Sequence, residues 1–179
     1  MSIEIDVLNG DASWPRVAPL MDAVWPDHVM EKLSWKDVKW AHADLRVLID
    51  APEGSPEGGL ACHVGIFFRT VLWNGRKVDI GGIGGVATRE DCRNHGYAGL
   101  ALGAAIQTMR DHEAIKFALL FCEPHNNAFY QKRGWHPFTG EIYAEQPEGR
   151  VRFEAMEPFV FDFTRAPRDG TIDLCGLPW

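Results

Sequence analysis

Apolar and polar residues alternate along two stretches in the first third of the chain, residues 3–8 (IEIDVL) and 45–50 (LRVLID). A period of two predicts strands that bury one face. Between them, residues 14–24 and 34–43 carry apolar side chains at helical spacing. This spacing predicts two helices, the second with Ser34 as its N-cap.

A long hairpin is predicted next. The Pro- and Gly-rich segment 51–59 indicates a loop, and the mostly apolar residues 60–73 indicate a long strand. Asn74-Gly75 is a strong signal for a tight turn, so residues 76–88 (RKVDIGGIGGVAT) should run back antiparallel. So many glycines in a strand favour a bulge or a close ligand approach, although a weakened edge strand remains the alternative.

The second half of the chain mixes helical and strand patterns. The continuous apolar run KFALLFCE is typical of a central, fully buried strand. The short helix that follows should begin at a capping Asn126 and end at Gly134. We expect helices at 98–112 and 126–135, strands at 116–123, 136–145 and 151–163, and an irregular tail at 164–179.

This order of elements predicts an α/β fold. The seven expected strands should form one mixed, mostly antiparallel sheet with helices on both of its faces. No shift in composition separates one part of the chain from another, so residues 1–179 are expected to form a single domain.

Composition narrows the function classes. The chain has 179 residues and a net charge of −7, with its basic residues dispersed, so a nucleic-acid binder is not expected. An acidic surface favours a cationic substrate such as an amine, or serves solubility alone. The four cysteines form no C-x-x-C pair, which argues against a zinc ribbon and a disulfide framework. With no membrane span and no secretion signal in the sequence, a reduced, cytoplasmic protein is expected.

The stretch CRNHGYAG (92–99) stands between the glycine-rich strand and the first helix of the second half. The first N–H groups of a helix have no partner inside it, and together with the helix dipole they form an anion site. Gly96 removes a Cβ from this turn, and Arg93 can add positive charge. The sequence has no Walker loop, and GGIGG lies within a strand rather than in a dinucleotide-binding turn. A plain structural turn is the alternative.

Two motifs in this region resemble those of one superfamily. VATREDCRNHGYAGLAL resembles motif A of the GNAT N-acyltransferases, and EPHNNAFYQKRGW resembles their next signature. Together they cover residues 76–138. The resemblance implies the GNAT fold and acetyl-CoA, or another acyl-CoA, as co-substrate, with no metal. The implied cofactor-binding residues are Val86, Ala87, Thr88, Arg93, Asn94, His95, Gly96, Tyr97, Ala98, Gly99 and Asn126.

A finer resemblance runs over most of the chain. GGIGGVATRED, YQKRGWHPF and the final Trp179 resemble the aminoglycoside 2′-N-acetyltransferases, and residues 43–50 and 63–86 also resemble the nodulation acyltransferase A family. The aminoglycoside group carries a Glu at the place of Gly84 and an Asp at the place of Leu177. Because both carboxylates are missing here, an aminoglycoside is not the expected substrate.

The resemblance also assigns catalytic roles. Tyr130 occupies the position of the general acid that protonates the leaving thiolate; a tyrosine packed under Trp135 is the alternative. Glu123 and His125 are the first candidates for the base, and His63 is the third. The carboxylate of Trp179 is a further candidate by analogy with the aminoglycoside group, and water alone could carry the proton.

The acceptor side is predicted from the tryptophans. In the superfamily, the region that contains Trp25, Trp35 and Trp40 lines the acceptor pocket, so rings facing it would make the acceptor partly apolar or aromatic. Gly84, Trp25, Trp35 and Trp179 are therefore the expected substrate-binding residues. The expected activity is transfer of an acyl group to the primary amine of a small molecule, by a chain that acts alone or as a homodimer. Alternatives are a long-chain acyltransferase resembling nodulation protein A and a non-catalytic acyl-CoA-binding module.

Overall fold

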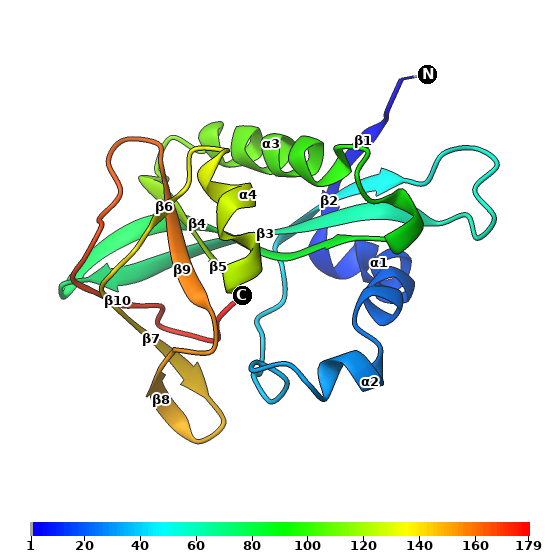
Figure 1. Ribbon diagram of the computed structural model, residues 1–179. Helices are drawn as coiled ribbons and strands as arrows, with labels where there is room; N and C mark the ends of the chain where they lie inside the picture. Colours follow the sequence, from blue (N-terminus) through cyan, green and yellow to red (C-terminus); the bar gives the residue numbers. More distant parts are fainter. Residues whose placement is uncertain (1) are drawn as a thin grey trace.

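The computed structural model describes residues 2–179, and within them ten strands form one strongly curled sheet (Figure 1). The strands are β1 (Ile5–Asn9), β2 (Leu45–Asp50), β3 (Leu60–Trp73), β4 (Arg76–Thr88), β5 (Phe117–Cys122), β6 (His136–Pro137), β7 (Glu141–Gln146), β8 (Gly149–Arg152), β9 (Glu157–Asp162) and β10 (Thr171–Asp173). The helices are α1 (Gly10–Val24), α2 (Asp27–Met30), α3 (Tyr97–Arg110) and α4 (Asn127–Gln131), with single 3₁₀ turns η1 (Glu90–Cys92) and η2 (Pro124–Asn126).

The long strand β3 organises the sheet. Its first half pairs with β2, which pairs with β1, and its last two residues pair with β10. On its other side β3 pairs along most of its length with β4, and the sheet continues through β5 and β9 to β6. Only the β4–β5 and β7–β10 pairs are parallel in the described residues, which confirms a mixed, mostly antiparallel sheet.

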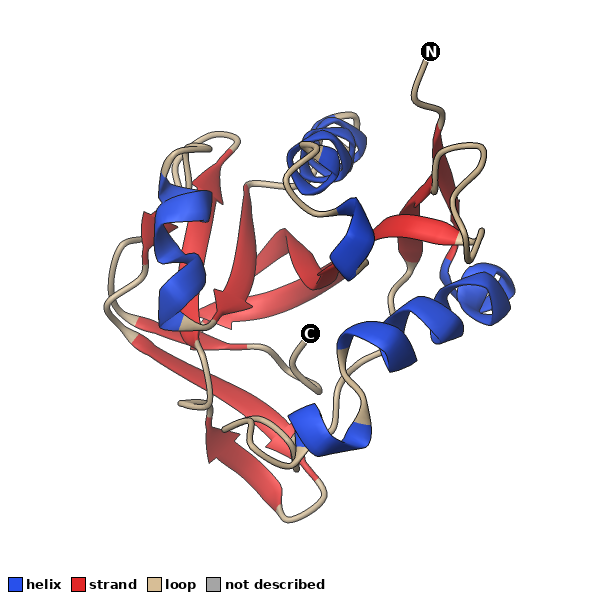
Figure 2. Cartoon of the chain, turned by 45° about the vertical axis from the view of Figure 1, so that its right-hand side comes forward, coloured by secondary structure: helices blue, strands red, loops and turns tan. Residues whose placement is uncertain are grey.

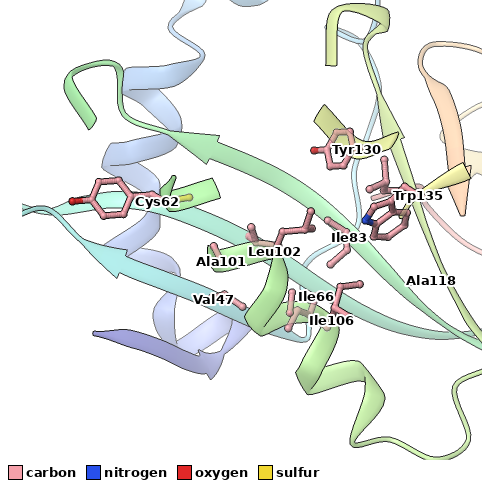
Figure 3. Packing of buried hydrophobic residues seen from close by; sticks show 14 of the residues in the cluster. Val47, Cys62, Ile66, Ile83, Ala101, Leu102, Ile106, Ala118, Tyr130 and Trp135 are labelled. Carbon is pink, nitrogen blue, oxygen red and sulfur yellow. The ribbon is translucent and has the colours of Figure 1, made fainter. Parts of the chain in front are cut away.

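Helices cover both faces of the sheet, as predicted. Figure 1 shows α3 above the sheet and α1 and α2 below it. Alternation along β2 follows this arrangement: Val47 and Ile49 belong to the core under α3, whereas Leu48 packs with Val17 on the side of α1. Figure 3 shows Leu102 of α3 among the buried strand residues of the first of these cores.

The predicted hairpin is confirmed residue by residue. β2, β3 and β4 have the predicted bounds, and Asn74 and Gly75 adopt φ values of 47° and 79°. Positive φ at both central residues is the geometry that a two-residue turn between twisted strands requires. The buried run of β5 is also confirmed as a central strand, between β4 and β9.

The prediction of a helix at residues 34–43 is wrong. The regular structure near it is the single turn α2, and residues 31–44 form turns and irregular backbone. Ser34 does not cap a helix; its hydroxyl donates to the carbonyl oxygen of Ala155, 2.9 Å away. Trp35 and Trp40 instead pack edge to face, with ring centroids 5.8 Å apart. Tertiary contacts override the local helical spacing here.

The C-terminal third also differs from the prediction. Residues 136–163 contain four short strands rather than two, and the tail expected to be irregular contains β10. Alternation of apolar and polar residues over such short strands is too brief to fix their bounds. β10 is defined by its pairing with β3 and β7, which come from distant parts of the chain. Figure 2 shows the chain ending in the middle of the molecule, between the sheet and the α1–α2 segment.

Candidate active site

The strands β4 and β5 separate partway along their length. Residues Gly81–Ile83 of β4 pair in parallel with Ala118–Leu120 of β5. Beyond these pairs, β4 continues to Thr88 and β5 to Cys122 without pairing to each other. The cause is a bulge in β4. Gly65 lies opposite Gly84 while His63 lies opposite Ala87, so β4 carries one residue more than β3 between these pairs. Gly85 takes a φ of 59° within this bulge, and the predicted bulge is thereby confirmed.

His63 holds the bulge from the neighbouring strand. Its Nδ1 lies 2.7 Å from the carbonyl oxygen of Gly85, and its Nε2 lies 3.0 Å from Nη1 of Arg46. A guanidinium has only donors, so Nε2 accepts and Nδ1 carries the hydrogen that is donated to Gly85. Burial, reinforced by the charge of Arg46, lowers the pKa of His63 to about 4, although the bond to Gly85 opposes the shift. His63 is therefore neutral at pH 7, and neither ring nitrogen is free to accept a substrate proton.

The predicted anion loop leads from β4 into α3. Gly96 adopts a φ of 82°, and no atom lies within 4 Å of the place where its Cβ would stand. The first helical bond runs from the N–H of Leu100 to the oxygen of Gly96, so the N–H groups of Tyr97, Ala98 and Gly99 precede the regular ladder. They form the donor-rich helix end that favours an anion.

The predicted cofactor residues divide into exposed and buried groups. Loop residues Arg93, Asn94, His95 and Gly96 are exposed. Arg93 is anchored by a bond from its Nε to the oxygen of Thr88, 3.3 Å away, and the Thr88 hydroxyl donates to Cys62 Sγ. The side chains of Tyr97 and Ala87 are buried in two different cores, which leaves their main chains as the parts that a ligand could meet.

Arg133 is a cation at this helix end that the sequence did not single out. A Cβ placed on Gly99 would stand 3.1 Å from Nη2 of Arg133, so the guanidinium lies against the first turn of α3. It is held there by a bond from Nη1 to the oxygen of Phe129 (2.9 Å) and by the Phe129 ring, 3.7 Å from the guanidinium carbon. Its only sequence signal is its place within the motif YQKRGW.

A cavity of about 470 Å³ opens where the strands separate. The expected residues Gly84, Val86, Glu123, Asn126 and Tyr130 line it. Asn126 precedes α4 without making a side-chain cap bond, contrary to the prediction. His125 is exposed on η2 and is not part of the lining, so the structure does not bring this candidate base to the cavity. Among the described residues no ion pair engages Glu123.

Tyr130 is a mostly buried residue of the cavity lining. The residue is 5 % exposed, and its ring packs edge to face on Phe129 and Trp135. Figure 3 shows Tyr130 beside Trp135 at one end of the core. Within residues 2–179 no hydrogen bond engages its hydroxyl. Burial, followed by the nearby Cys122, raises the pKa of Tyr130, so the phenol stays protonated at neutral pH and can act as a proton donor.

Trp179 forms a second wall of the cavity. Its indole N–H donates to the oxygen of Leu119 (2.9 Å), and its ring stacks on Phe67 with centroids 5.8 Å apart. A Cβ on Gly82 would stand 2.3 Å from this ring, and a Cβ on Gly84 would stand 2.8 Å from the main-chain carbon of Trp179. The glycines of β4 thus make room for Trp179, and a side chain at Gly84 has no space beside it.

The sequence of this chain matches the profile of a known protein family. A family profile described as an acetyltransferase (GNAT) domain matches residues 7–138. The chain belongs to the GNAT acetyltransferase family. The GNAT fold that the sequence predicted is thereby confirmed.

Several solved structures resemble most of the chain at low sequence identity. The N-acetyltransferase YhbS from Escherichia coli, in complex with CoA, has a TM-score of 0.60 and 13 % identity over 96 % of this chain and 89 % of its own. A GNAT acetyltransferase from Brucella melitensis, in complex with acetyl-CoA, has a TM-score of 0.57 and 12 % identity over 94 % of both chains. Escherichia coli ElaA has a TM-score of 0.60 and 17 % identity over 90 % of this chain and all of its own.

Two further properties describe this GNAT chain. Residues 2–179 contain no group of three or more His, Cys, Asp or Glu side chains placed to hold a metal ion. None of the helices in the same range has the length and apolar character needed to cross a membrane.

Proposed function

We propose that this GNAT protein transfers an acyl group, most simply acetyl, from acyl-CoA to the primary amine of a small molecule by direct attack. One observation carries the proposal: the parallel pairing of β4 and β5 stops at Ile83 and Leu120, and the opening beyond it holds both Tyr130 and the cavity. Along the chain, β4 is followed by the loop with Gly96 and then by α3, so the proposed phosphate site would come directly after the strand that carries the proposed reaction site.

The residues present fit coenzyme A. Its pyrophosphate would be held by the N–H groups of Tyr97 to Gly99, with Arg93 and Arg133 supplying positive charge. The absence of a Cβ at Gly96 leaves the approach to that helix end open. The pantetheine arm would lie along the edge of β4 near Val86, which β5 has left unpaired. These assignments are part of the proposal.

The chemistry divides among few residues. Bound acyl-CoA supplies a thioester with a good leaving group. An alkyl amine, with a pKa of about 10.4, is mostly protonated at pH 7, so a base or a path for its proton is needed. Glu123 lines the cavity and is proposed for that role, directly or through water. Val86 is proposed to offer a main-chain N–H to the developing oxyanion, and Tyr130 to protonate the leaving sulfur.

The test measures thiol release and cofactor binding separately. Purified protein is given acetyl-CoA and a panel of primary amines, and free thiol is followed over time. Acetyl-CoA binding is measured by calorimetry and by thermal shift, since a ligand that binds the folded state stabilises it. Binding together with amine-dependent thiol release supports the proposal. Binding without release for any amine supports the non-catalytic module, and no binding of any acyl-CoA refutes both.

A long-chain acyltransferase is the second candidate, because the cavity wall is rich in tryptophan and methionine. A series of acyl-CoA donors from acetyl to palmitoyl distinguishes the two, since only a long-chain enzyme gains catalytic efficiency with chain length. The resemblance to the aminoglycoside and nodulation acyltransferase branch, the cytoplasmic location and the homodimer remain predictions from the sequence.

A further inference from the structure

Five of the chain's seven tryptophans line the cavity: Trp14, Trp25, Trp35, Trp40 and Trp179. Trp25, Trp35 and Trp40, here called the tryptophan wall, form a continuous edge-to-face series. The ring centroids of Trp25 and Trp35 lie 5.6 Å apart, and those of Trp35 and Trp40 lie 5.8 Å apart. Phe153 extends the series at 5.9 Å from Trp40. Such pairs fix one another's orientation, so the wall is rigid.

The tryptophan wall borders the core but comes from outside the sheet: Trp35 is buried, and Trp25 and Trp40 pack against buried clusters. It comes from the end of α1 and from residues 31–44, which form neither a long helix nor a strand. Trp25 and Trp40 are only half-buried although they are among the largest apolar side chains. Met21, Met30 and Met156 line the same cavity, and their flexible thioethers pack well against flat rings. A surface of this kind is suited to a flat apolar ligand.

The charges in the cavity select a cation. Asp22 and Glu123 supply the lining side-chain carboxylates, and Arg46 is the lining guanidinium. Arg46 is already committed: it donates to the oxygen of Gly10 and to His63, and it lies 4.9 Å above the ring of Trp14. An anionic acceptor would therefore find no available cation among the described lining residues. A protonated amine would find two carboxylates and several aromatic faces.

We propose that the acceptor is an arylalkylamine: a primary amine joined by a short linker to an aromatic body that packs on the tryptophan wall. This inference rests on the proposed function. A polyhydroxylated amino sugar would lose hydrogen bonds to water on a wall of indoles and thioethers. A long acyl chain would fill the same volume but would leave the carboxylates Asp22 and Glu123 without a partner of opposite charge.

The experiment compares amines of similar size. Thiol release from acetyl-CoA is measured with 2-phenylethylamine and tryptamine, with n-hexylamine as the aliphatic match, and with spermidine and an aminoglycoside as polycations. We expect kcat/KM for the aryl amines to exceed that for n-hexylamine by about tenfold, the value of one or two aromatic contacts. Trp25→Leu and Trp40→Leu should remove about that factor for the aryl amines, mainly through KM, and lower kcat/KM for n-hexylamine by a clearly smaller factor.

Trp73→Leu is the matched control, because Trp73 lies at the hairpin end of β3 outside the cavity lining. It should leave the preference for aryl amines intact, and thermal unfolding checks that all variants fold. Equal kcat/KM for aryl and alkyl amines, or an equal loss for both in the Trp25 variant, overturns the inference while the proposed function stands. If no amine releases thiol, the proposed function fails, and calorimetry decides the inference: tighter binding of 2-phenylethylamine than of n-hexylamine supports it, and equal or absent binding overturns it.

Discussion

His63 on β3 donates its Nδ1–H to the carbonyl oxygen of Gly85 on β4, 2.7 Å away, at the point where β4 bulges. The direction of this bond is fixed by Arg46, which occupies the other ring nitrogen. The pair therefore holds the strand edge that would face the thioester, although neither residue is placed to move a proton. A histidine that the sequence offered as a third candidate base is, in the structure, a positioning residue.

Exchanging His63 tests this role. In His63→Asn the side-chain amide nitrogen stands near the place of Nδ1 and can still donate to Gly85, whereas His63→Ala leaves that oxygen without this donor. Both variants remove the acceptor of Arg46 Nη1, while the bond from Arg46 Nε to the oxygen of Gly10 remains. We expect the Ala variant to lose about 1–3 kcal/mol of stability and the Asn variant less. Thiol-release kinetics should show kcat falling in the Ala variant and substantially restored in the Asn variant. Equal kcat in wild type and both variants would mean that the bulge needs no such support.

The same histidine makes stability depend on pH. Its pKa is about 4 in the folded protein against 6.5 when unfolded, so between these values the unfolded chain binds more protons. Stability is therefore complete above pH 6.5 and falls as the pH drops towards 4, with a total loss from this group of about 3 kcal/mol. Urea unfolding of wild type and His63→Asn from pH 4 to pH 7 measures it. The two stability curves should converge as the pH falls, and parallel curves would contradict the assignment.

Tyr130→Phe removes the proposed proton donor while keeping the buried ring. We expect kcat for thiol release to fall about 100-fold, the usual size of a lost general acid. Acetyl-CoA affinity, measured by calorimetry, should change little, because the packing against Phe129 and Trp135 is kept. Full activity in the Phe variant would mean that the Tyr130 hydroxyl is not the proton donor and that the residue is purely structural.

Gly82→Ala tests the space made for Trp179. The new methyl group would stand 2.3 Å from the indole ring, which is also fixed by Leu119. Overpacking of this kind should cost about 1–3 kcal/mol in urea unfolding. Gly103→Ala is the control, since its Cβ would meet nothing within 4 Å on an exposed part of α3, and there the change should stabilise by about 0.5–1 kcal/mol. A neutral Gly82→Ala would show that Trp179 is not held against β4.

Arg133→Gln tests the second cation at the start of α3. Losing a charge-assisted contact to phosphate should weaken acetyl-CoA binding about tenfold and flatten its dependence on salt. Arg76→Gln, on the exposed hairpin far along β4, is the matched control and should leave affinity unchanged. Calorimetry at two salt concentrations decides. If both substitutions weakened acetyl-CoA binding equally, Arg133 would contribute only through the net charge of the protein and not through a local contact.

Much of this protein is determined locally. The strands β2, β3 and β4, the turn at Asn74-Gly75 and the buried run of β5 follow from alternation, turn chemistry and continuous apolarity. The glycine loop before α3 and the short helix with Tyr130 are motifs of contiguous residues, so the sequence also identified the family.

The remaining features depend on residues that are distant in sequence. Trp35 and Trp40 carry helical spacing, but ring-on-ring packing gave residues 31–44 an irregular backbone. Only the folded chain brings Arg133 to Gly99, Arg46 to His63 and Trp179 to the glycines of β4. Hydrophobic periodicity records which face of an element is buried, but not which side chain it meets there. The sequence by itself therefore determined the strands β2 to β5 and the two family motifs, and the tertiary structure alone decided the C-terminal strands and the shape and charge of the acceptor cavity.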